Sequence, residues 1–193
     1  MITASLLQEK KPYTRIDMTK FELQIQQDLH HYLMMMEKVE ERLPDAPDIE
    51  EKWEQLAQEY LPDGIREFGA YPTVSLGWMM YVGMAVAQMW DEDWQKYSAL
   101  ENIYTHLRDQ RGYDNMDEYI REDVLKLSTD EYASIEKIVA ECASRTHSQL
   151  RHANLEPGTK AAFQAYILCL HQLYLMGAAV QLKALGYRMT KVN

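Results

Sequence analysis

Turn-forming residues and cysteines are scarce in this chain. Its 193 residues include 8 Gly, 6 Pro and 2 Cys. A β-rich fold needs many more turns than so few Gly and Pro provide, so long helices are favoured. Cys142 and Cys169 lie within helical apolar patterns and do not suggest a secreted disulfide scaffold. Because Glu9, Lys10 and Lys11 interrupt any apolar signal segment, we expect a cytoplasmic protein.

The usual signatures of catalysis and metal binding are also missing. The sequence contains no Gly-rich phosphate loop, no His-Glu-x-x-His and no Cys-x-x-Cys. None of the six histidines follows a Glu by three residues, as the ligands of di-iron bundles do. Asp28 and His31 share a helical face, but a metal site needs two or three further ligands. We therefore expect no metal and no cofactor, and no catalytic centre is evident in the sequence.

Positive charge is outnumbered. The chain has 20 Lys and Arg against 30 Asp and Glu, a formal net charge of −10. Such a surface repels polyanions, which argues against nucleic-acid binding. The composition, 47% hydrophobic and 26% charged, is that of a globular protein. From the length we expect a flexible N-terminal segment 1–15, a single helical-bundle domain 16–188 and a C-terminal tail 189–193.

Two long runs carry no charge at all, Ala70–Trp90 and Ala161–Leu182. A helix that is apolar on every face must be enclosed by protein or by lipid, and both runs are long enough to span a bilayer. The first run is flanked by carboxylates and not by Lys or Arg, and the second contains His171 and three glutamines. We therefore expect two central apolar helices in a soluble bundle, and membrane insertion is the less favoured alternative.

Apolar residues elsewhere recur at three- and four-residue steps, which indicates amphipathic helices around the two apolar runs. The sequence thus predicts an all-α, up-and-down bundle of about five to seven helices. Small residues such as Gly83 and Gly177 would let the two central helices approach closely. The first expected helix is 18–43, and the second begins at Asp48, in a capping box with Glu51, and ends at a turn at 62–64. The region 72–111 is expected to form one helix or two. Two more helices are expected to start at Asn115 and Ser128, and the last is 159–186.

One group of polar residues falls within the apolar runs. His171 and Gln172 lie midway along the second run, and buried polar groups need hydrogen-bond partners. Tyr81, Gln88 and Tyr174 could supply them, which would form a polar ligand pocket between the two central helices. Imidazole in such a pocket can act as an acid, a base or a ligand contact. The alternative is a structural His171 that bonds to a neighbouring Tyr or Gln.

Two functional hypotheses follow. The acidic surface and the lack of a convergent catalytic set favour a protein that acts through protein–protein interaction, as an adaptor, an immunity-like protein or a homodimer. The alternative is a helical bundle that binds a small molecule, or acts on one, in a pocket around His171. A polar void beside His171 would favour the second hypothesis, and close packing there would favour the first.

Overall fold

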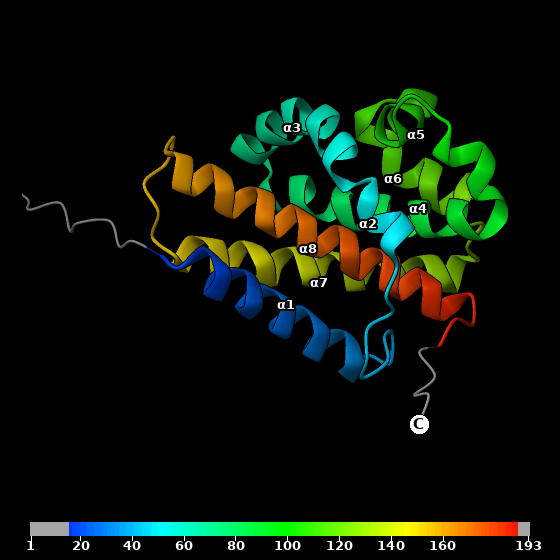
Figure 1. Cartoon of the computed structure of the whole chain (residues 1–193), viewed down its shortest axis with the longest axis horizontal. Coiled ribbons are helices and arrows are strands. Elements are labelled where there is room, and N and C mark those ends of the chain that lie inside the picture. Colours follow the sequence, from blue (N-terminus) through cyan, green and yellow to red (C-terminus); the bar gives the residue numbers. More distant parts are fainter. Residues whose placement is uncertain (1–15, 189–193) are drawn as a thin grey trace, which may run out of the picture.

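A computed structural model describes residues 16–188, and all the regular elements in that range are helices (Figure 1). The predicted all-α bundle is confirmed. The segments 1–15 and 189–193, expected to be a flexible segment and a tail, lie outside the described residues. The helices are α1 (Met18–Met35), α2 (Pro47–Glu51), α3 (Trp53–Ala70), α4 (Pro72–Ser98), α5 (Ile103–Arg111), η1 (Tyr113–Asn115), α6 (Met116–Tyr119), η2 (Ile120–Val124), α7 (Thr129–His152) and α8 (Lys160–Ala184).

The two predicted apolar helices, α4 and α8, lie against each other at the centre. Figure 1 shows α8 crossing the middle of the molecule, with α1 and α7 along one side and α2 and α3 along the other. Two glycines set the contact, because a Cβ atom on Gly83 would collide with the carbonyl oxygen of Tyr174. A Cβ atom on Gly177 would likewise collide with the carbonyl oxygen of Met80. The two backbones therefore touch, as the small residues predicted.

Neighbouring helices cover the apolar surface of both central helices. All residues of α4 from Met79 to Ala87 are buried. Among the described helices, α8 is the one long and apolar enough to cross a membrane, yet 78% of its most apolar stretch is buried inside the protein. The other helices of the bundle therefore bury the apolar surface of α8.

Helix α1 is shorter than the predicted helix 18–43, because it ends at Met35. Glu37 adopts a left-handed conformation with φ of 58°. This reversal allows the amide of Lys38 to donate to the carbonyl of Leu33 at 2.9 Å, which closes the helix in a Schellman motif. Glycine usually occupies that position, so the sequence carries no signal for the helix end here.

The predicted capping box at Asp48 is wrong. Helix α2 begins one residue earlier, at Pro47, after Ala46, which makes no side-chain cap. Proline suits this first position because its missing N–H would have no partner in the helix. The carboxylate of Asp48 instead accepts a hydrogen bond from the indole of Trp90 at 3.2 Å.

The predicted turn at 62–64 is also wrong, because α3 continues through it to Ala70. Pro62 is exposed, and so is Gln58, whose carbonyl would accept the missing N–H of residue 62 in a regular helix. Asp63 in this stretch accepts hydrogen bonds from Tyr104 at 2.5 Å and from Arg108 at 3.1 Å, which fastens α5 onto α3. This tertiary contact outweighs the local preference of Pro-Asp-Gly for a turn.

The region 72–111 forms two helices, α4 and α5, and α4 is kinked at Asp93. Asn102 begins α5, where its side chain accepts the amide hydrogen bond of Thr105 at 3.1 Å. The predicted cap at Asn115 is not made, since its side chain bonds no amide of the short helix that follows. The cap at Ser128 is confirmed, because its Oγ accepts the amide three residues on at 3.3 Å.

Asp63 supports a prediction about stability and pH. Burial raises the pKa of Asp63, but hydrogen bonds from Tyr104, Arg108 and Arg66 outweigh burial and hold the pKa below its usual value. We expect Asp63→Asn to lower the free energy of unfolding at pH 7 by about 1 to 2 kcal/mol. The ionised form stabilises the fold above the unfolded pKa of about 3.9, and this stabilisation is lost as the pH falls through the folded pKa.

Urea denaturation of both proteins between pH 7 and pH 3 measures this effect. The difference in the free energy of unfolding between the unaltered protein and Asp63→Asn should become smaller as the pH approaches 3. Asp109→Asn is the matched control, because Asp109 also pairs with Arg108 but its side chain is 63% exposed. A difference that stayed constant with pH would contradict the role given to the Asp63 carboxylate.

Candidate functional site

His171, the centre of the predicted pocket, faces α2 and α3. Its ring stacks on the indole of Trp53 with 4.8 Å between ring centroids. The carboxylate of Glu50 lies 3.3 Å from Nε2, but the geometry is not that of a hydrogen bond, and Nε2 is buried without a partner. Burial lowers the pKa of His171, although the carboxylates of Glu50 and Glu22 act in the opposite direction. His171 is therefore packed against an aromatic ring.

The two α8 residues expected beside His171 bond to different helices. Gln172 turns towards α1, where its amide donates to Glu22 at 3.0 Å. Tyr174 donates its hydroxyl hydrogen to the carbonyl of Ile49 in α2 at 2.6 Å. Tyr174 nevertheless stays beside His171, because its ring also packs on Trp53, with 5.3 Å between ring centroids. Gln172 faces another side, because successive residues of a helix point about 100° apart.

The two α4 residues of the predicted pocket lie elsewhere. Tyr81 packs edge-on against Trp78 and faces the guanidinium of Arg121, with 5.7 Å from Cζ to the ring centroid. Gln88 accepts a hydrogen bond from Gln181 at 2.8 Å. The five predicted residues are therefore not gathered around one space, because the backbones of α4 and α8 touch where that space would be.

A large apolar groove lies at another place, where the ends of α3 and α7 meet the start of α8. Its volume is about 750 Å³. Ile65 and Phe163, which line it, are 48% and 43% exposed, unusually high for such large apolar side chains. Its lining residues are Ile65, Phe68, His147, Leu150, Arg151, Leu155, Pro157, Gly158, Thr159, Lys160, Ala162, Phe163 and Tyr166.

A buried hydrogen-bond network fixes one wall of this apolar groove. The hydroxyl of Tyr166 lies 2.5 Å from Oγ of Ser75, which also donates to the carbonyl of Gly64 at 2.8 Å. The hydroxyl of Tyr166 is thus hydrogen-bonded inside the protein. Its ring packs on Phe68 with 5.0 Å between ring centroids. Tyr166 therefore lines the groove with its aromatic ring, while its hydroxyl already has a hydrogen-bond partner inside the protein.

The turn that leads into α8 forms the rim of the apolar groove. Gly158 adopts φ of 79°, a left-handed conformation that glycine tolerates best. Thr159 then caps α8, since its Oγ1 accepts the amide hydrogen bond of Ala162 at 3.3 Å. The N-terminal end of α8, which begins at Lys160, therefore lies at the groove.

His147 also lies on the wall of the groove. Its ring meets Phe68 edge-on with 6.0 Å between centroids. Burial and the nearby guanidinium of Arg151 lower the pKa of His147. His147 is therefore mostly neutral at pH 7, and it contributes a flat ring to the groove with little charge.

The described residues offer little for covalent or metal chemistry. No group of three or more His, Cys, Asp or Glu side chains in the range 16–188 is arranged to hold a metal ion. Both cysteines are buried and free, and burial raises the pKa of each thiol to about 12. Thiols with so high a pKa are poor nucleophiles.

Sequence reasoning missed the groove because its residues belong to three separate segments. One signal was present: Phe163 lies in the first turn of the second apolar run, beyond the part that the other helices cover. Ile65 directly follows the stretch 62–64 that was expected to be a turn. Only the continuation of α3 past Pro62 brings Ile65 and Phe68 to the start of α8.

The chain was compared with protein-family models, with curated proteins and with solved structures, and no match was found.

Proposed function

We propose that this protein binds a small molecule with an apolar chain in the groove between α3, α7 and α8. The observation that carries the proposal is the groove itself, because its volume of about 750 Å³ lies within the 300–1,000 Å³ usual for ligand pockets. Small-molecule binding was the alternative hypothesis from the sequence, and the proposed place differs from the polar pocket expected around His171.

The lining supports an apolar ligand. Ile65, Phe68, Leu150, Leu155 and Phe163 present hydrocarbon or aromatic surface from both sides of the groove. Apolar area removed from water stabilises a complex by about 25 cal/mol per Å², or about 0.8 kcal/mol per methylene. Each methylene added to a bound chain should therefore lower the dissociation constant about fourfold until the groove is full.

The role in protein–protein interaction that the composition suggests stays a prediction. Outside the groove, the largest exposed apolar side chains of the described surface include four on and just after α1. These are Leu23, Met34, Met35 and Met36. Met35 is the most exposed of them, at 65%.

Titration with N-phenyl-1-naphthylamine, a neutral dye that fluoresces in apolar surroundings, tests the proposed function. We expect saturable binding of one dye per chain, displaced by straight-chain alcohols with an affinity that rises with chain length. Ile65→Asp and Phe163→Asp should each weaken dye binding at least about tenfold, because each places a carboxylate against the apolar chain. Both positions are partly exposed, so the fold should persist.

Leu23→Asp is the matched control for these two variants. Leu23 is 49% exposed, close to Ile65 and Phe163, but it lies on α1 and does not line the groove. Its replacement should leave dye binding unchanged. An equal loss of binding in Leu23→Asp, or no saturable binding in the unaltered protein, would refute the proposed function.

A further inference from the structure

We infer that the ligand of the groove carries an anionic headgroup, such as a carboxylate, at the end of a single apolar chain. This inference rests on the proposed function and adds the chemical class of the ligand. It is drawn from the charges around the groove, which differ in sign from those of the chain as a whole.

The first observation is the absence of carboxylates from the groove. The chain has 30 acidic residues against 20 basic ones, yet none of the described residues that line the groove is Asp or Glu. The charged lining residues are Arg151 and Lys160, both cationic at pH 7. Glu156 lies next to lining residues in the sequence, but its side chain is exposed and does not line the groove. An anion at the rim would therefore meet attraction and little repulsion.

The second observation is that neither cation has a counter-charge among the described residues. Neither Arg151 nor Lys160 makes an ion pair with any residue in the range 16–188. Several other arginines do pair: Arg66, Arg108, Arg111, Arg121 and Arg145 each contact a carboxylate. A guanidinium without a partner beside an apolar groove can bind a carboxylate through two parallel hydrogen bonds.

The third observation is the direction of α8. Its first residues, including Lys160 and Ala162, line the groove, so the positive end of the helix dipole lies at the same rim. Thr159 accepts the amide of Ala162, whereas the helix itself offers no acceptor to the amides of its first two residues, 160 and 161. The two cations and the start of α8 thus all favour an anion in this groove, whose apolar lining can bind the chain of the same ligand.

The geometry points to a free amphiphile whose headgroup lies at Arg151 and Lys160 and whose chain lies along Leu150, Leu155 and Phe163. A paired titration with decanoate and decanol tests this, since the two molecules share a ten-carbon chain and differ in charge. Both should displace N-phenyl-1-naphthylamine, and decanoate should bind about tenfold more tightly at low ionic strength. Added salt should reduce that preference, because the rim is open to solvent.

The double variant Arg151→Gln/Lys160→Gln should remove the preference for decanoate and leave decanol binding unchanged. Arg42→Gln/Lys137→Gln is the matched control, because it removes the same two side-chain types from exposed positions that do not line the groove. Equal affinities of the unaltered protein for decanol and decanoate would overturn the inference while the proposed function stands. Binding of neither molecule would overturn both.

Discussion

Gly83→Ala should lower the free energy of unfolding by at least about 3 kcal/mol. The added methyl group would overlap the carbonyl oxygen of Tyr174, which belongs to a helix backbone and cannot turn aside as a side chain can. Helices α4 and α8 would have to separate along their contact, and close packing would be lost between the two most buried helices. Gly177→Ala should have the same effect through the carbonyl of Met80.

Thermal denaturation followed by circular dichroism measures both variants. A loss of about 3 kcal/mol corresponds to a fall in the midpoint of roughly 6 to 12 °C for a chain of this size. Gly69→Ala is the control, because Gly69 also lies in a helix but nothing approaches its Cβ position within 4 Å. Its stability should stay the same or rise by up to about 1 kcal/mol. Unchanged stability in Gly83→Ala would show that the two helices do not cross there.

Ser75→Ala should be the next most damaging change, at about 2 to 3 kcal/mol. Ser75 is fully buried, and it joins three helices through two hydrogen bonds of its hydroxyl and one of its carbonyl. Removal of the Ser75 hydroxyl leaves the hydroxyl of Tyr166 buried without a hydrogen-bond partner. The carbonyl of Gly64 also loses the hydrogen bond that Ser75 donates to it. The hydrogen bond from Tyr60 to the carbonyl of Ser75 should remain.

A double-mutant cycle separates this network from simple loss of packing. Tyr166→Phe should cost less than Ser75→Ala, since Ser75 keeps its bond to Gly64. The double variant Ser75→Ala/Tyr166→Phe should be no less stable than Ser75→Ala alone, because no unpaired hydroxyl then stays buried. Ser144→Ala, at an exposed position of α7, should change stability by less than about 0.5 kcal/mol. Strictly additive losses would contradict the network.

The central pair of helices was predictable because its signal is local. An uncharged run of more than twenty residues must be covered whatever surrounds it, and small residues in both runs indicate close contact. The ends of the outer helices were less predictable. Glu37 occupies a left-handed position without glycine, and Pro62 lies inside a helix on its solvent side. At Pro62 the tertiary contacts of Asp63 with Tyr104 and Arg108 outweigh the local preference for a turn.

The predicted polar pocket failed to assemble for a physical reason that the sequence already contained. Gly83 and Gly177 bring the two backbones into contact, and such contact leaves no space for side chains between the helices. The same glycines that correctly indicated a close crossing thus argue against a pocket there. His171 and Tyr174 turn outward to α2 and α3, and Tyr81 turns to Arg121.

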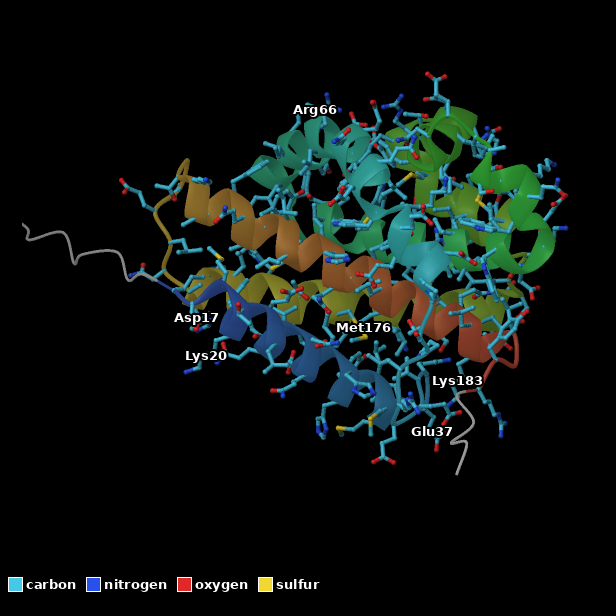
Figure 2. All side chains as sticks on the ribbon, viewed as in Figure 1. Asp17, Lys20, Glu37, Arg66, Met176 and Lys183 are labelled. Atoms are coloured by element: carbon cyan, nitrogen blue, oxygen red, sulfur yellow. The ribbon has the colours of Figure 1, made fainter. Side chains whose placement is uncertain are left out.

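The apolar groove could not be predicted because it depends on where three segments end. Ile65, Leu150 and Phe163 are far apart in the sequence, and each belongs to an ordinary helical pattern. Figure 2 shows Arg66, next to Ile65, at the outer edge of α3, and Asp17 at the end of α1 where the turn between α7 and α8 also lies. The groove exists because α3 and α8 run on beyond the helices that cover their middle parts.

Methyl NMR with selectively labelled Ile, Leu and Val tests the central claim most directly. On titration with decanol, the signals of Ile65, Leu150 and Leu155 should shift together and saturate at one molecule per chain, while those of Leu23 and Val82 stay in place. Shifts centred on Leu23, or spread over all exposed methyl groups without saturation, would contradict a ligand site between α3, α7 and α8.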